Sequence, residues 1–306
     1  MFHIQWFITR LLKPIVSLIL VIILVVNYPS TVLAQTNPFQ NIWERIRSLP
    51  ESLQTRTQGA PVAGRQKAGA GRGRCPALIP LDEDNEIPLT AFVPAIQEEQ
   101  PTLSNSDNVS PSKLTYVWGR TIEQYPTFWF YIPYGSEESK TEYGKFVLLD
   151  KDKHIISGQI FVKIPIGNNP SLAKFTLPKS ENPLEINQEY NWYFSIVCNP
   201  LKPSRNPGVT GWIERVNLPS FSLGNYRYYA EKGIWYDTVT RFVESADPQT
   251  LSQQLDWLLL IKFVFRNVEN VEDVSMNDND FNQIVNKIAN FPIQTLTPVP
   301  NPELQR

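Results

Sequence analysis

The sequence has few of the side chains that most often bind metal ions or act as catalysts. Its 306 residues include two cysteines, Cys75 and Cys198, and two histidines, of which only His154 lies beyond residue 34. Structural zinc sites use four cysteine or histidine ligands, and nucleophilic catalysis by serine or cysteine requires a histidine beside the nucleophile. We therefore expect no metal ion, no cofactor and no catalytic residue, and we predict that the protein is not an enzyme.

The sequence also lacks an excess of basic residues. It has 28 lysine and arginine residues against 30 aspartate and glutamate residues, which gives a net charge of −2. Proteins that bind nucleic acid do so largely through basic residues that contact the phosphates. We therefore expect no nucleic-acid partner.

The glycine- and arginine-rich residues 59–75 lack the features of a phosphate-binding loop. Such a loop continues with a lysine, a serine or threonine, and a helix. Here Arg74 is followed by Cys75-Pro76, and proline has no amide hydrogen to donate. We predict that residues 35–75 form a flexible tether, with a short amphipathic helix around Phe39–Ile46 as the alternative.

The first 34 residues have the layout of a secretory signal peptide. Arg10 and Lys13 precede a mainly apolar run, Ile15–Val26, and Val32-Leu33-Ala34 supplies aliphatic and small residues before a cleavage site. The apolar run is shorter than the roughly 20 residues of a membrane-spanning helix. We predict export, removal of residues 1–34 and no stable membrane span afterwards. A membrane anchor is the alternative.

Export would place the two cysteines in an oxidising environment. An even number of cysteines in an exported protein is usually paired, so we predict a disulfide between Cys75 and Cys198. The alternative is two unrelated buried thiols. A bridge would stabilise the fold chiefly by restricting the unfolded chain.

The stretch Tyr190–Cys198 is the most informative for the fold. Tyr190, Trp192, Phe194 and Ile196 share one face when the chain is extended, because successive side chains of a strand point to opposite sides. A strand that opens with tyrosine after a short turn also resembles the tyrosine corner of a β-sandwich. We predict the central strand of an antiparallel sheet.

Further strand-like segments, separated by proline, asparagine and glycine, surround this stretch. Their density predicts a mainly β protein, with an immunoglobulin- or fibronectin-like antiparallel β-sandwich over residues 76–224. The segments are Leu89–Val93, Thr115–Trp118, Phe128–Ile132, Lys145–Leu149, Ile155–Ile164, Leu172–Leu177 and Val209–Leu218.

The apolar pattern of the C-terminal quarter changes to the three- and four-residue spacing of helices. Trp257–Phe265 is apolar on nearly every side, so we predict that residues 225–292 form helices packed on the sandwich. We expect the proline-rich residues 293–306 to be a disordered tail. The predicted helices are Trp235–Ala246, a second that begins at Asp247-Pro248, and Asp280–Phe291.

Five aromatic residues are candidate contacts for a ligand or partner: Trp129, Tyr131, Tyr134, Trp235 and Tyr236. On the strand Phe128–Ile132, Trp129 and Tyr131 face away from the two phenylalanines, and only one of these sets can fill the sandwich. The other set is either covered by the C-terminal helices or exposed. Exposed tryptophan and tyrosine rings would suit stacking on sugar rings or on a partner protein.

Glu214 is expected to be half-buried, because it shares a strand face with Trp212 and Val216. A carboxylate in that position needs a partner, and we expect an ion pair at the strand end or a hydrogen bond to the backbone. A glycosidase-like acid is the alternative, for which no second acid is identifiable.

Five segments occur in an order that resembles a known family. They are Gly71–Pro76, Pro126–Pro133, Tyr190–Cys198, Gly211–Val216 and Gly233–Asp237. Together they resemble the cyanobacterial domain-of-unknown-function 928 family over about residues 59–265. The resemblance implies an exported envelope protein and carries over no catalytic residue.

These observations favour a non-enzymatic binding or scaffolding protein of the cell envelope, with an envelope protein or a glycan as its partner. A carbohydrate-binding module for envelope glycans is the first alternative, and a hydrolase is the second. A row of exposed aromatic rings would favour the glycan. A pocket with at least two converging polar side chains would be needed for the hydrolase.

Export can be tested on protein isolated from the cells that make it. We expect N-terminal sequencing and intact mass to show a chain that begins at Gln35, because signal peptidases cleave after small residues such as Ala34. A chain that retains Met1 would contradict export to the periplasm and would favour a membrane-tethered form.

Overall fold

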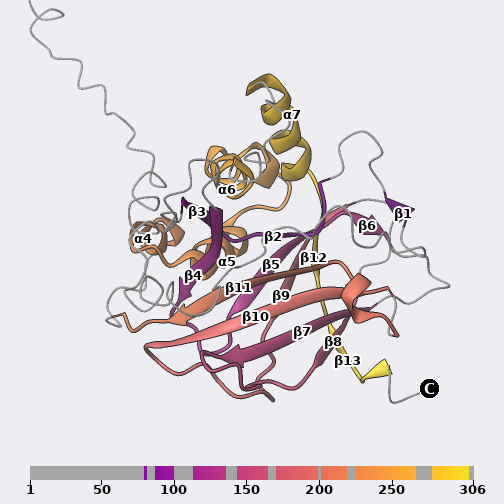
Figure 1. Cartoon of the computed structure of the whole chain (residues 1–306). Coiled ribbons are helices and arrows are strands. Elements are labelled where there is room, and N and C mark those ends of the chain that lie inside the picture. Colours follow the sequence, from indigo (N-terminus) through magenta and orange to yellow (C-terminus); the bar gives the residue numbers. More distant parts are fainter. Residues whose placement is uncertain are drawn as a thin grey trace, which may run out of the picture. The chain divides into compact units, whose positions relative to one another are not determined.

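The computed structural model describes residues 79–80, 87–99, 113–135, 143–164, 170–198, 201–218, 225–266 and 278–302. The predicted signal peptide, the predicted tether and Cys75 lie outside these ranges. The described strands form two larger sheets and a separate pair, β1 (Ile79–Pro80) with β6 (Tyr134–Gly135) (Figure 1).

The largest sheet has the strand order β13-β8-β7-β10-β11-β4-β3. Its central strand, β10 (Gln188–Val197), pairs antiparallel with β7 (Tyr143–Asp150) and with β11 (Gly208–Arg215). Strand β11 in turn pairs in parallel with β4 (Lys113–Thr121). The outer strands are β3 (Ala95–Glu99), β8 (Ile160–Lys163) and β13 (Pro298–Val299).

The second sheet has the order β12-β9-β5-β2. Its strands are β2 (Thr90–Ala91), β5 (Thr127–Ile132), β9 (Ser171–Thr176) and β12 (Ile293–Thr295). Strands β12 and β9 are parallel, and the other pairs are antiparallel. The predicted mainly β class is therefore confirmed, and one parallel pair in each sheet makes both sheets mixed.

Aromatic side chains fill the space between the two sheets. The rings of Phe128 and Phe146 lie 4.7 Å apart, and those of Phe130 and Phe194 are stacked at 4.2 Å. Trp192 meets both phenylalanines of β5 edge-on. The apolar face predicted for the central strand is confirmed by the burial of Tyr190, Trp192, Phe194 and Ile196.

The predicted tyrosine corner is present at the start of β10. The Tyr190 hydroxyl accepts a hydrogen bond from the Glu185 amide at 2.9 Å, which is the backbone contact that defines this feature. Burial raises the pKa of Tyr190 above its usual value, so the hydroxyl stays neutral. The finer expectation of immunoglobulin- or fibronectin-like connectivity stays a prediction.

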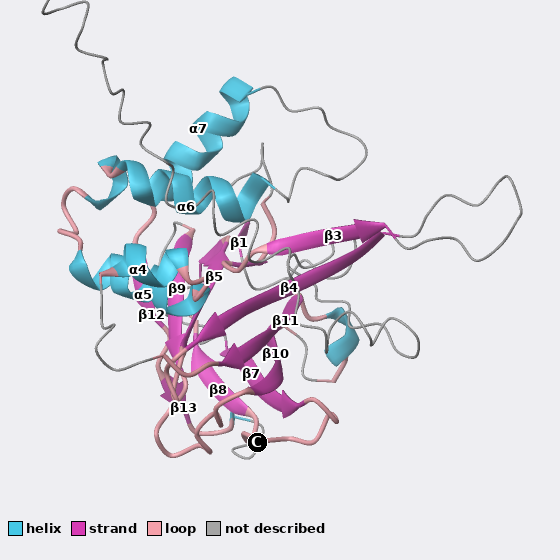
Figure 2. Cartoon of the chain, turned by 90° about the vertical axis from the view of Figure 1, so that its left-hand side faces the viewer, coloured by secondary structure: helices cyan, strands magenta, loops and turns pink. Residues whose placement is uncertain are grey.

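Four described helices gather at one end of the sheets (Figures 1 and 2). Helix α5 (Trp235–Ser245) packs on β4 and β5, and α7 (Asp278–Ala289) lies close to its predicted position. The predicted start of the second helix is wrong, because Asp247 accepts the Gln249 amide in a turn and α6 begins eight residues later. The remaining bounds are α4 (Tyr226–Glu231) and α6 (Leu255–Arg266).

The prediction of a disordered tail is wrong for residues 293–302. Strands β12 and β13 pair with β9 and β8, and the Leu296 amide donates to the Lys174 carbonyl at 2.8 Å. Leu296 itself is buried. Both strands lie at sheet edges, where proline is tolerated because one side of the strand needs no amide donors. The prolines therefore led to the prediction of a disordered tail, although edge strands tolerate them.

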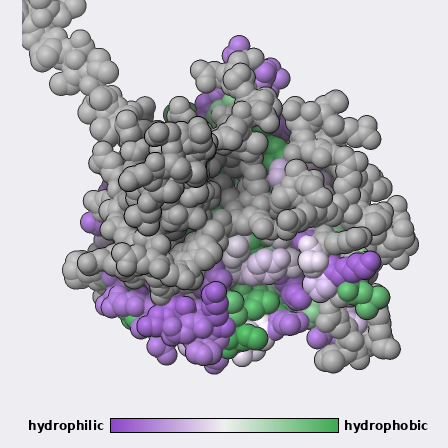
Figure 3. All heavy atoms as spheres, in the orientation of Figure 1, coloured by the Kyte–Doolittle hydropathy of each residue, from purple (hydrophilic) through white to green (hydrophobic). Residues whose placement is uncertain are grey.

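Most large apolar side chains of the described ranges lie inside. Figure 3 shows hydrophilic side chains gathered along the lower part of one face, with smaller hydrophobic patches beside them. The exposed large apolar residues are Ile155, Ile186, Leu201 and Leu255. No helix within the described ranges is long and apolar enough to cross a membrane.

Gly211 of β11 offers a test of this packing. A Cβ atom there would lie 2.5 Å from Cζ2 of Trp192 and 2.8 Å from Cγ1 of Val117. We expect Gly211→Ala to lower the free energy of unfolding by about 1–3 kcal/mol, because a filled core must shift to admit the methyl group. Chemical denaturation measures this change.

Gly158→Ala is the matched control, since a Cβ atom at Gly158 would meet nothing within 4 Å. We expect it to change the free energy of unfolding by less than about 0.5 kcal/mol. Equal denaturation midpoints for the two variants would contradict the tight contact between β10 and β11.

Candidate functional site

Four of the five candidate aromatic contacts lie in the core. Trp129, Tyr131, Trp235 and Tyr236 are each at most 2% exposed. The Trp129 Nε1 donates to the Thr240 hydroxyl at 3.0 Å, so α5 covers this face of β5. The alternative in which the helices cover the rings is therefore the one observed, and these faces are closed to a sugar ring. The Tyr134 side chain lies outside the described part of the chain.

Tyr236 anchors α5 to the sheets. Its hydroxyl accepts a hydrogen bond from Trp192 Nε1 at 2.8 Å and donates to the Trp212 carbonyl at 3.2 Å. Gly119 of β4 makes room for the ring, since a Cβ atom there would lie 3.0 Å from Cε2 of Tyr236. Burial raises the pKa of Tyr236 far above its usual range. This anchor fixes the position of the next residue, Asp237.

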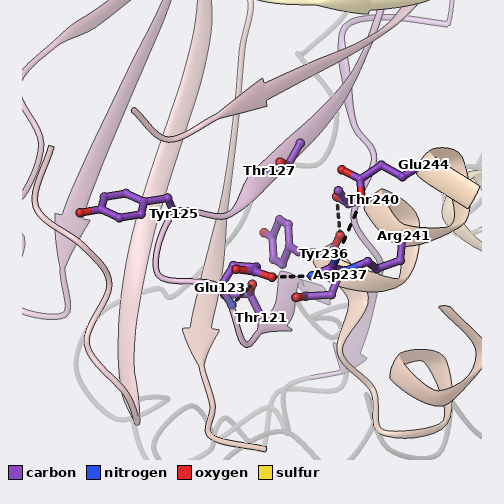
Figure 4. A pocket seen from close by; sticks show the side chains of 9 residues that line it. All are labelled: Thr121, Glu123, Tyr125, Thr127, Tyr236, Asp237, Thr240, Arg241 and Glu244. Atoms are coloured by element: carbon purple, nitrogen blue, oxygen red, sulfur yellow. Dashed lines mark hydrogen bonds and ion pairs between the residues drawn. The ribbon is translucent and has the colours of Figure 1, made fainter. Parts of the chain in front are cut away.

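A cavity of about 240 Å³ opens beside this anchor, between α5 and the chain that links β4 to β5 (Figure 4). We call it the Asp237 pocket. Sheet-side residues and one face of a helix meet there, so side chains far apart in the sequence converge. The lining residues are Thr121, Glu123, Tyr125 and Thr127 from the sheet side, and Tyr236, Asp237, Thr240, Arg241 and Glu244 from α5.

Asp237 is the buried charged group of this pocket. Its side chain is 3% exposed, and its Oδ2 accepts a hydrogen bond from the Ile122 amide at 3.2 Å. Its Oδ1 is also buried and has no hydrogen-bond partner among the described residues. Burial raises the pKa of Asp237 to about 7, although the nearby Thr121 side chain and the Ile122 amide lower it in part. Asp237 can therefore gain or lose a proton near neutral pH.

The rim of the pocket carries an ion-paired arginine. Arg241 Nη2 lies 2.8 Å from an oxygen of Glu123, and its Nη1 lies 3.9 Å from Glu244 (Figure 4). All three side chains are between 42% and 53% exposed, so these pairs add little to stability. Arg241 is thereby shared by two carboxylates. Its charge lowers the pKa of Asp237 in part, but its described ion pairs are with Glu123 and Glu244.

The hydroxyl groups of the pocket are mostly engaged. The Thr240 hydroxyl accepts from Trp129 and donates to the Tyr236 carbonyl at 2.8 Å. The Thr127 hydroxyl bonds to that of Thr176, also at 2.8 Å. Thr121 accepts the Glu123 amide at 3.1 Å. Among these polar groups of the described lining, the Asp237 Oδ1 is the buried atom without a hydrogen-bond partner.

Glu214 has the partner expected from the sequence. Its carboxylate lies 2.8 Å from Nε of Arg120, which is its register neighbour on β4. The Arg120 guanidinium also lies 4.9 Å from the centre of the Trp118 ring. Because Glu214 does not line the Asp237 pocket, the structure places it in a structural ion pair.

His154 belongs to a turn. The Asp150 carboxylate accepts the backbone amides of Asp152 and His154, each at 2.8 Å, and lies 3.0 Å from the His154 ring. These contacts close the β7–β8 hairpin and account for the grouping of Asp150, Asp152 and His154 in one turn. Cys198 is half-buried after β10, and its predicted bridge stays a prediction because Cys75 lies outside the described residues.

Sequence reasoning did not identify Asp237, Glu123 or Arg241 as site residues. The available signal was local: Asp237 ends the stretch Gly233–Asp237 and directly follows the aromatic residues Trp235 and Tyr236. If those rings are buried, a charge beside them needs a partner or a function. Glu123 and Arg241 gave no such signal, because they are 118 positions apart and meet only in the fold.

The raised pKa of Asp237 predicts a pH dependence of stability. Its folded value of about 7 exceeds the model value of 3.8, so the native state binds the proton more tightly than the unfolded state. The free energy of unfolding should therefore fall by about 1.4 kcal/mol per pH unit from pH 4 to pH 7, about 4 kcal/mol in all, and level off above that. D237N should abolish this contribution.

Denaturation of wild type and D237N at several pH values measures the effect as the difference between the two proteins. We expect the free energy of unfolding of D237N to increase relative to that of wild type as the pH rises to 7. Glu244→Gln, on the rim of the same helix, is the control and should leave the slope in place. A D237N protein that loses stability relative to wild type between pH 5 and pH 7 would contradict the assignment.

The comparisons with known proteins identify the family. No curated protein and no solved structure is significantly similar to the chain. Residues 67–274 match the family model described as Domain of Unknown Function (DUF928). The match contains the central strand β10 and every residue that lines the Asp237 pocket, and it covers more than half of the sequence. The chain therefore belongs to the DUF928 family.

Proposed function

We propose that this protein is a non-enzymatic binding protein of the cell envelope that holds a small polar solute in the Asp237 pocket. The observation that carries the proposal is the buried Asp237 carboxyl, whose Oδ1 has no partner within the described structure although the residue lines a cavity. Burying a polar group without a hydrogen bond is costly. A bound solute that supplies the missing contact would offset this cost.

The size of the pocket supports a small solute. Its volume of about 240 Å³ is below the roughly 300–1,000 Å³ of sites for larger ligands. Most of its lining residues carry polar or charged side chains, and such groups fix the orientation of a bound solute and provide specificity. Export to the envelope rests on the layout of residues 1–34 and remains part of the proposal.

A glycan-binding module has less support. Such a module would stack sugar rings on exposed aromatic side chains, and Trp129, Tyr131 and Trp235 are buried. Scaffolding through an envelope protein would need an exposed apolar surface. Leu201 and Leu255 are well exposed, but they are single residues.

A hydrolase is the second candidate, because Asp237 meets one requirement of acid–base catalysis. Its pKa of about 7 is the value that suits a general acid or base at neutral pH. Glu123 and Arg241 also converge on the pocket. What the described lining residues do not provide is an activated nucleophile, so binding remains the first proposal.

The proposal can be tested by closing the pocket. Thr127 lines it, whereas its cross-strand partner Thr176 does not, and the two share one hydroxyl–hydroxyl bond. Thr127→Phe should fill the cavity. Thr176→Phe is the matched control, since it loses the same hydrogen bond and leaves the cavity open.

Purified protein is screened by thermal denaturation against amines, amino acids, monosaccharides and organic acids. A solute present at about 100 times its Kd stabilises by roughly 2.7 kcal/mol, which raises Tm by about 5–10 °C for a domain of this size. We expect such a rise in wild type and T176F and its absence in T127F. No rise with any solute, or an equal rise in T127F, would contradict binding in this pocket.

A further inference from the structure

We propose that the solute of the Asp237 pocket is a small organic cation with one ammonium group, and that the Asp237 carboxylate is its counter-ion. This inference rests on the proposed function, to which it adds the class of ligand. It starts from one atom, Oδ1 of Asp237, which is buried and has no hydrogen-bond partner in the described structure. A buried carboxylate in this state is stabilised most by a cation.

The charges around Asp237 favour a cation over an anion. The pocket is lined by three carboxyl groups and one guanidinium, and Arg241 already lies against both Glu123 and Glu244. Tyr229 of α4 is also within electrostatic reach of Asp237, and burial raises its pKa, so it adds no charge. Tyr236 is neutral for the same reason. An anion would therefore meet net repulsion.

The geometry favours an ammonium group over a metal ion. Calcium takes six to eight oxygen ligands, and magnesium takes six. Here Glu123 and Glu244 are held by Arg241, so a metal ion would find one open carboxylate in a cavity of about 240 Å³. An ammonium group has three donors, which Asp237 Oδ1 and the Thr121 hydroxyl would accept in part.

The rest of the cavity limits the size of the cation. Its volume of about 240 Å³ has room for a few heavy atoms, and Tyr236 lies beside Asp237, whereas the Tyr125 ring points away from both (Figure 4). The cavity also opens at a rim of charged side chains, which would be reached from solvent (Figure 4). A cation of a few heavy atoms would therefore fit inside the cavity and find a counter-ion there.

Competition between the cation and a proton for Asp237 should make the affinity of the site depend on pH. Burial raises the pKa of Asp237 to about 7, and a cation is attracted only by the ionised form. The affinity for a cation should therefore be constant well above pH 7 and should fall about tenfold per pH unit below it. A neutral solute would show no such fall.

Isothermal titration calorimetry with three probes that share a three-carbon skeleton tests the inference on the purified protein. The probes are propylammonium chloride, propan-1-ol and sodium propionate, at constant ionic strength and at several pH values from 5.5 to 8.5. We expect propylammonium alone to bind, with a millimolar Kd of the order that four heavy atoms allow. D237N should weaken its binding at pH 8.5 at least tenfold and remove the pH dependence.

Two controls keep the result interpretable. Circular dichroism and the denaturation midpoint report whether D237N is folded, and T127F should also abolish binding while T176F retains it. An affinity that does not change with pH, or that D237N leaves intact, would overturn the cation inference. A neutral or anionic solute that binds wild type and T176F but not T127F would overturn it too, while leaving the proposed function standing. No binding by any solute would overturn both.

Discussion

The hydroxyl of Tyr236 joins the helical part of this protein to its sheets. It bonds to Trp192 on the central strand and to the Trp212 carbonyl on the neighbouring strand. The ring lies over Gly119, where a side chain would collide with it. Because both hydrogen bonds are buried, losing either would leave a polar group unsatisfied in the core. The first turn of α5 is thereby held in one place on the sheet.

The Asp237 pocket is a consequence of that anchor. Asp237 follows Tyr236 directly, so the anchored turn carries its carboxyl to the Ile122 amide. The same contacts exclude water from the carboxyl, and this raises its pKa. The fold therefore retains an acid at an energetic cost that an apolar residue would avoid. A bound solute that contacts Oδ1 would offset this cost.

The aromatic residues of β5 show that one strand pattern is compatible with two interpretations. Trp129 and Tyr131 looked equally suited to a core and to a binding surface, because a strand pattern places side chains on two faces without specifying what covers them. Helix α5 covers the second face, and the Trp129–Thr240 hydrogen bond fixes that arrangement. Because these rings are buried, they are not available to contact a ligand. The candidate site is formed instead by the mainly polar residues that line the Asp237 pocket.

Features that depend on neighbouring residues could be predicted from the sequence. The alternation around Trp192 gave the buried face of the central strand, and helical spacing gave α5, because both patterns repeat within a few positions. The parallel pairing of β11 with β4, the edge strands of the tail and the Asp237 pocket could be recognised only in the folded protein. Asp237 reaches Ile122 across 115 positions, and Arg241 reaches Glu123 across 118. Such contacts depend on how sheets and helices are assembled, which no local pattern of residues encodes.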